Sequence, residues 1–179
     1  SHVVWLQNAF AGIRVCVCVL IFNTVVKLIK KAVTLLEKAS RVMCFGTGGS
    51  MILASECANL FSTVTDKVFA VADTHSQISI LATMSKNDAI VLFSYSGATT
   101  EMVECMKIMK ENNVPTIAIT RCVNSPVSEL ASQKLYTTAT ESVFRSGAMA
   151  SRTSQLNIID ILYTALANDQ YETSLEQLS

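Results

Sequence analysis

The sequence lacks a surplus of charge of either sign and lacks long apolar runs. Fourteen basic and fourteen acidic residues among 179 leave no net charge, so no overall field attracts the chain to nucleic acid or to an anionic membrane.

The longest apolar stretch, residues 15–26, is interrupted by Asn23 and Thr24, and it is shorter than the ~20 residues that cross a bilayer. No small-residue cleavage site of a secretory signal follows it. We therefore expect no membrane contact, and contact with DNA only through a segment outside this chain.

Cysteine pairs of the kind that bind zinc are also missing. The six cysteines contain no Cys-x-x-Cys pair, and most of them interrupt apolar runs, where a free thiol packs as a small hydrophobic side chain. Cys16 and Cys18 form a Cys-x-Cys pair, but no histidine or second cysteine pair accompanies it. The pattern predicts free thiols in a reducing, cytoplasmic compartment, with no metal site and no cofactor.

No low-complexity tract, repeat or linker divides the chain, and half of its residues are hydrophobic, which is enough for one core. We predict an N-terminal extension at 1–24 and one domain at 25–179. The extension opens with Ser1-His2, which is typical of an expression-tag remnant. Residues 25–39 carry apolar side chains at helical spacing, whereas residues 15–21 suit a strand or a buried helix, of which we favour the helix.

From residue 41 onwards, short apolar segments of strand length alternate with helical segments. The predicted strands cover residues 42–45, 68–71, 89–93, 116–119 and 134–137. This alternation predicts an α/β fold, a three-layer αβα sandwich whose five-stranded parallel sheet has helices on both faces. A last helix, predicted at 148–167, is apolar around most of its circumference. One sheet face cannot cover both of its flanks, so we expect a homodimer or homotetramer, although a central place in the core would also bury the helix.

Two loops rich in glycine and hydroxyl groups follow the first and third predicted strands. They read Gly46-Thr47-Gly48-Gly49-Ser50 and Ser94-Tyr95-Ser96-Gly97-Ala98-Thr99-Thr100-Glu101. Glycine lets a ligand approach the backbone, the hydroxyls are neutral donors, and the next helix adds unpaired N–H groups at its positive end. Because these loops meet at the carboxyl edge of a doubly wound sheet, they predict a cradle for one phosphate group without a fixed cation. Helix capping alone is the competing interpretation of the hydroxyls.

A nucleotide site fits the same loops less well. Gly46-x-Gly48 after a strand and Asp73 after the next one suggest a dinucleotide fold, but the third fingerprint position holds Met51 instead of glycine. No Gly-Lys-Ser/Thr sequence follows the glycines, which excludes a Walker loop. A second hydroxyl-rich loop favours a phosphate monoester.

The two loops, together with Phe144-Arg145-Ser146-Gly147-Ala148-Met149-Ala150-Ser151-Arg152, resemble the sugar isomerase (SIS) domain. The third segment resembles the RpiR/MurR type of transcriptional regulator, and the resemblance covers residues 25–178. It implies a flavodoxin-like sheet, a dimer, and a phosphosugar held by the residues that match Ser50, Ser94, Ser96 and Thr99. Position 98, often Glu in the family, is Ala98 here. The expected ligand set is Gly48, Gly49, Ser50, Ser94, Tyr95, Ser96, Gly97, Thr99, His75, Arg145 and Ser146. Arg152 is expected instead to contact a carboxylate or another subunit.

An aldose–ketose isomerase needs a general base and an acid, commonly Glu with His, and the predicted last helix contains neither. We therefore assign no catalytic residue and predict a phosphosugar-sensing domain. The alternative is an isomerase that uses Glu101, Glu141 or His75. The resemblance implies an N-terminal helix-turn-helix domain in the regulators, and no basic recognition helix precedes the first strand here. We expect that domain to lie outside these 179 residues.

Overall fold

A parallel sheet of five strands forms the centre of the part of the chain that the structure describes. The computed structural model describes residues 2–138 and 149–169. Its strands are β1 (Val42–Phe45), β2 (Val68–Ala70), β3 (Ala89–Phe93), β4 (Thr116–Arg121) and β5 (Gln133–Thr137). Its helices are α1 (His2–Lys38), α2 (Gly49–Phe61), α3 (Thr74–Thr83), α4 (Thr100–Glu111), α5 (Pro126–Leu130) and α6 (Met149–Asp169). The predicted α/β fold is confirmed, with each strand displaced by at most two residues at either end.

The strand order is β2-β1-β3-β4-β5, and every neighbouring pair is parallel. This is the flavodoxin-like order, in which the chain leaves β1 toward one edge and returns to the other side of β1 as β3. The loops that follow β1 and β3 therefore lie beside each other at the carboxyl edge of the sheet. That edge is the usual ligand site of open α/β sheets.

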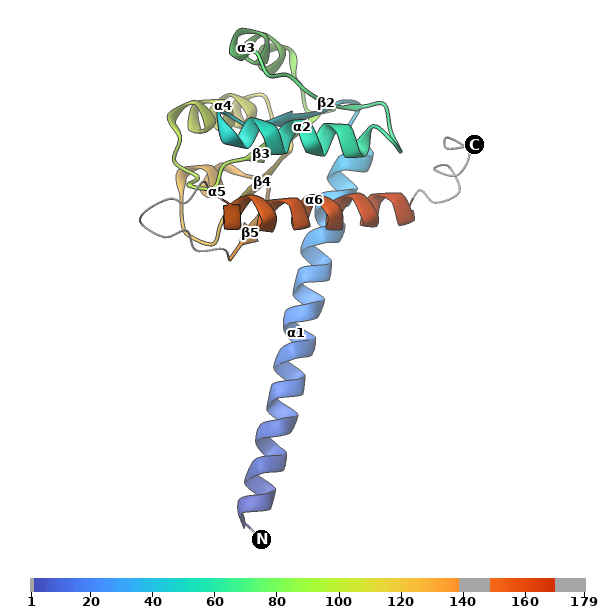
Figure 1. Cartoon of the computed structure of the whole chain (residues 1–179), viewed down its shortest axis with the longest axis vertical. Coiled ribbons are helices and arrows are strands. Elements are labelled where there is room, and N and C mark those ends of the chain that lie inside the picture. The colour runs from blue at the N-terminus through green and yellow to red at the C-terminus, as the bar shows by residue number, and fades with distance from the viewer. Residues whose placement is uncertain (1, 139–148, 170–179) are drawn as a thin grey trace.

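Alternate residues of the strands pack against two different helix layers, as the period of two in a strand requires. On one face, Cys44, Val91 and Ile117 pack against α1, α2 and α6. On the other face, Met43 and Ile90 pack against α3, α4 and α5. Figure 1 shows the two layers, with α2 and α6 on the side of α1. The predicted three-layer sandwich is thus confirmed.

Helix α1 crosses the predicted boundary at residue 24 without a break. Its last two turns pack into the core through Ala32, Val33 and Leu36, whereas the preceding part projects away from the domain (Figure 1). The helical interpretation of residues 15–21 is confirmed. The division between an extension and a domain stays a prediction. No helix within the described residues is both long enough and apolar enough to cross a membrane.

The cysteines whose side chains are described are free thiols. Cys44, Cys57 and Cys105 are buried, and Cys122 is exposed. Burial raises the pKa of the Cys105 thiol to about 12, so it stays protonated and packs as an apolar group, as expected. Among the described residues, no group of three or more His, Cys, Asp or Glu side chains is placed to hold a metal ion.

Candidate functional site

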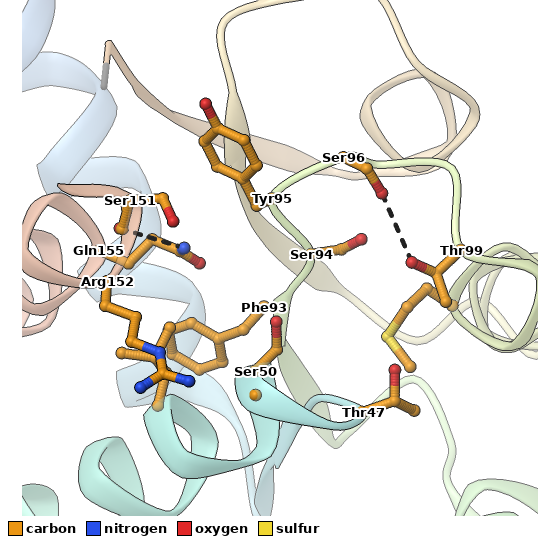
Figure 2. Close-up of a pocket in the computed structure, with 13 residues that line it drawn as sticks. Thr47, Ser50, Phe93, Ser94, Tyr95, Ser96, Thr99, Ser151, Arg152 and Gln155 are labelled. Carbon is orange, nitrogen blue, oxygen red and sulfur yellow. Dashed lines mark hydrogen bonds between the residues drawn. The ribbon is translucent and has the colours of Figure 1, made fainter. Parts of the chain in front are cut away.

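A cavity of about 420 Å³ opens at the carboxyl edge of the sheet, where β1, β3 and α6 meet. The loop after β1, the loop after β3 and the first turns of α6 supply its walls (Figure 2). The lining residues are Thr47, Gly49, Ser50, Leu53, Phe93, Ser94, Tyr95, Ser96, Thr99, Met102, Ser151, Arg152 and Gln155. The two predicted loops are thus brought together around one cavity.

One side of the cavity is lined by hydroxyl groups from the loop after β3 and from Thr47 (Figure 2). The hydroxyl oxygens of Ser96 and Thr99 lie 3.4 Å apart, and the amide N–H of Ala98 donates to the Ser96 Oγ at 3.3 Å. Thr99 is the N-cap residue of α4, yet its side chain makes no capping hydrogen bond. Its hydroxyl therefore remains available to a ligand, and helix capping does not account for it.

Ser94 is the most deeply buried of these hydroxyl residues. It is 3 % exposed, and its Oγ has no hydrogen-bond partner among the described residues. Leaving a buried hydroxyl unpaired costs about 1–3 kcal/mol. Within the described part of the chain, this hydroxyl at the wall of the cavity is therefore open to a ligand.

Glycine gives both loops their shape. Gly97 has a φ of 65°, its N–H donates to the carbonyl of Ser94 at 3.2 Å, and its carbonyl accepts from Val127 at 3.1 Å. A Cβ at Gly97 would overlap the Oγ of Ser125. Gly48, the N-cap of α2, has a φ of 53° but open space around it. Neither Gly48 nor Gly97 is among the residues that line the cavity. Each glycine shapes its loop through its positive φ.

A buried amide supports the loop after β1 from behind. Gln77 of α3 is 2 % exposed, and its Nε2 donates to the carbonyl of Val71 at 2.6 Å and to that of Gly46 at 3.4 Å. These bonds join the loops after β1 and β2. The sequence analysis missed Gln77, which lies two residues after the expected ligand residue His75.

The opposite side of the cavity is formed by Ser151, Arg152 and Gln155 of α6 (Figure 2). A terminal guanidinium nitrogen of Arg152 lies 3.1 Å from the position that a Cβ on Gly49 would take, at the N-terminus of α2. We expected Arg152 to serve a structural or intersubunit role and the two-loop phosphate cradle to contain no fixed cation. The structure places the Arg152 side chain at the wall of the cavity, and its expected structural or intersubunit role stays a prediction.

The remaining expected ligand residues are placed elsewhere or are not described. His75 is exposed in the first turn of α3 and does not line the cavity. Asp73, the acid of the dinucleotide alternative, is the N-cap of α3 and accepts from the backbone N–H of Ser76 at 2.7 Å; this hydrogen bond lowers the pKa of its carboxyl. Arg145, Ser146 and Glu141, the last a candidate base of the isomerase alternative, lie outside the described residues.

The cavity wall, as far as the structure describes it, contains no acidic side chain and no histidine. Arg152 is its only charged residue in that part of the chain. Glu101 is exposed on the first turn of α4 and does not line the cavity. Hydroxyl groups, two helix N-termini and one guanidinium together make a surface that suits an anion.

Comparisons with known proteins agree with the fold. The model of the SIS domain family matches residues 35–165. The chain belongs to the SIS domain family. Its SIS domain is 38 % identical over 149 residues to the uncharacterized HTH-type transcriptional regulator YbbH of Bacillus subtilis, a match over 83 % of this chain and 53 % of that protein. A regulator from Caldanaerobacter subterraneus is 35 % identical over 148 residues, which is 83 % of this chain and 52 % of that protein.

The chain thus spans about half the length of these curated relatives. Among solved structures, the SIS domain resembles the Vibrio vulnificus NanR protein complexed with ManNAc-6P, with a TM-score of 0.77, 24 % identity, and coverage of 85 % of this chain and 58 % of that one. It also resembles the sugar isomerase domain of an RpiR transcription factor from Sphaerobacter thermophilus. The TM-score is 0.75, the identity is 24 %, and the match covers 85 % of this chain and 83 % of that one. These two likenesses show the shared fold.

Proposed function

We propose that this SIS domain is the phosphosugar-binding effector domain of an RpiR-type transcriptional regulator of sugar or amino-sugar catabolism. The observation that carries the proposal is the buried Ser94 hydroxyl, which has no hydrogen-bond partner among the described residues and lies beside Ser96 and Thr99 at the N-terminus of α4. A phosphate monoester offers several acceptor oxygens to donors of this kind, and the helix end favours its negative charge. Ser50 and the N-terminus of α2 complete the cradle.

Sensing is favoured over turnover because isomerisation needs a base that can move a proton between neighbouring carbons. Within the described residues, no carboxylate or imidazole lines the cavity. The matched relatives are HTH-type regulators, and NanR was solved with ManNAc-6P. The proposal includes a cytoplasmic location and DNA binding through a helix-turn-helix domain outside these 179 residues, with the bound metabolite shifting the arrangement of a dimer.

A calorimetric panel tests this function. N-acetylmannosamine 6-phosphate, glucosamine 6-phosphate, glucose 6-phosphate and arabinose 5-phosphate are titrated into the chain, each beside its unphosphorylated sugar as the matched control. We expect saturable binding of at least one phosphorylated sugar and none of its control, because the cradle binds the phosphate. Failure of the whole panel to bind, or equal binding of a sugar and its phosphate, would refute the proposal. A coupled assay that detects isomerised product, lost on changing Glu101, Glu141 or His75, would instead establish the enzyme.

The dimer in this proposal is supported by a groove between α1 and α6 whose exposed surface is mainly apolar. Phe22 and Val26 of α1 and Ile161 and Ala165 of α6 supply that surface, and the polar residues of the lining are Asn157, Asp160, Thr164 and Asn168. Phe22 is 68 % exposed and Ile161 is 49 % exposed, and Leu20 and Ile21 continue the apolar surface along α1. Because α1 projects beyond the domain here (Figure 1), the described part of its own chain leaves this surface exposed, and a second copy would cover it.

Ile161→Glu is expected to separate the dimer, because an ionised carboxylate would be buried in an apolar interface. The cost of roughly 3 kcal/mol or more corresponds to at least a 100-fold weaker association. Sedimentation velocity across a concentration series measures the effect. Ile78→Glu, which changes an exposed isoleucine of α3, is the matched control and should leave the dimer intact. A dimer that survives Ile161→Glu unchanged would exclude this groove as the interface.

A further inference from the structure

The side of the cavity formed by α6 adds the polar side chains of Arg152 and Gln155 to those of the two loops. We propose that Arg152 and Gln155 recognise the sugar portion of the metabolite and so determine which phosphosugar binds. In this arrangement Arg152 donates to a sugar oxygen, and the Oε1 of Gln155 accepts from a sugar hydroxyl or an acetamido N–H. The inference rests on the proposed phosphosugar function and assigns the selectivity of that site.

The side-chain oxygen of Gln155 accepts no hydrogen bond from the described residues. The residue is 1 % exposed, and its Nε2 donates to the carbonyl of Ser151 one turn earlier at 3.2 Å. That bond fixes which side-chain atom is the nitrogen, because exchanging Nε2 and Oε1 would place the Oε1 of Gln155 against the carbonyl oxygen of Ser151. The Oε1 is buried with no hydrogen-bond partner among the described residues. A buried amide oxygen that lines a cavity indicates that a ligand supplies the donor.

The guanidinium N–H groups of Arg152 have no acceptor among the described residues. In the part of the chain that the structure describes, it has no ion pair and no hydrogen bond to its side chain. Its guanidinium lies against Gly49 at the N-terminus of α2, which is itself the positive end of a helix. Two positively polarised groups placed together favour an electron-rich partner between or beside them.

The spacing and position of the pair support a common target. Residues three apart on a helix share one face, so both side chains face the same cavity. Figure 2 shows them on the α6 side, with Phe93 and Ser50 between them and the hydroxyls of Ser96 and Thr99. A phosphate on the hydroxyl side would leave the sugar extending toward α6. A donor beside an acceptor suits the hydroxyl and acetamido groups of a hexose or hexosamine.

Affinities for the sugar-phosphate panel and for inorganic phosphate test the inference, because inorganic phosphate has no sugar portion. In Gln155→Met and Arg152→Met we expect at least a tenfold weaker affinity for the tightest-binding sugar phosphate, and a change of less than about threefold for inorganic phosphate. Ser96→Ala should weaken both. Lys107→Met, which changes an exposed cation of α4, is the control and should weaken neither. Thermal unfolding verifies that each variant is folded, and Gln155→Asn, which withdraws the amide by one methylene, replaces Gln155→Met if that variant unfolds.

Three results would overturn the inference. Unchanged affinity of both α6 variants for the sugar phosphate would show that Arg152 and Gln155 do not contact the sugar. An equal loss for sugar phosphate and inorganic phosphate would place the pair in the phosphate cradle. If the unaltered chain bound no sugar phosphate, the proposed function would fail, and this inference with it. The first two results would leave the proposed function standing.

Discussion

Gly97→Ala is expected to destabilise the domain by about 2–5 kcal/mol and to abolish phosphosugar binding. A side chain at a φ of 65° costs about 1–3 kcal/mol, and the added Cβ would overlap the Oγ of Ser125, which adds an overpacking cost of similar size. Relief of the overlap would move the loop that contains Ser96 and Thr99. Thermal unfolding should show a melting temperature lower by roughly 5–15 °C, and calorimetry should show no binding.

Gly48→Ala is the matched control for this change. Gly48 has a similar φ of 53°, but a Cβ there would have no atom within 4 Å. The variant should lose only the stability that corresponds to the backbone cost, about 1–3 kcal/mol, and should still bind the sugar phosphate. Equal losses in the two variants would show that packing against Ser125 does not hold the loop in place.

Ser94→Ala is expected to change stability and affinity in opposite directions. The hydroxyl of Ser94 is buried without a partner among the described residues, so its removal should stabilise the ligand-free domain by about 1 kcal/mol. If that hydroxyl donates to a phosphate, the variant should bind the sugar phosphate roughly 10- to 100-fold more weakly, because a hydrogen bond to a charged group contributes about 1.5–3 kcal/mol. Substitutions at functional sites often raise the stability of a protein and weaken its binding of ligand.

Melting temperature without ligand and the calorimetric Kd together test this expectation. Ser62→Ala is the control, because Ser62 is exposed and its Oγ donates to the carbonyl of Asn59 at 2.7 Å, far from the cavity. A lower melting temperature with an unchanged Kd in Ser94→Ala would mean that Ser94 has a structural role only.

The sheet and the meeting of the two loops could be predicted because both follow from local patterns. Runs such as Ala89–Phe93 are apolar at every position, which is typical of a parallel strand that is buried on both faces. Once the strand order places β1 beside β3, Ser50 and Ser96 must approach each other at the carboxyl edge. No long-range information beyond the βαβ alternation was needed.

The α6 side of the cavity could not be predicted in the same way. Arg152 approaches Gly49 through the packing of α6 on α2, and no local pattern encodes a contact between helices so distant in sequence. Gln155 in an apolar helix was the one available signal, because a polar residue buried among hydrophobic neighbours needs a reason. His75 does not line the cavity, because helix geometry, and not proximity in sequence to the end of β2, decides which α3 residue faces inward. Gln77 is that residue.

Amide chemical shifts of the ¹⁵N-labelled chain during a titration with inorganic phosphate test the central claim most directly. Phosphate held by the loops after β1 and β3 should produce saturable shifts at Ser50, Ser96 and Ala98 that follow one binding curve. The same titration in Ser96→Ala should require a higher phosphate concentration. Saturable shifts confined to other residues, with these three amides unchanged, would contradict the account.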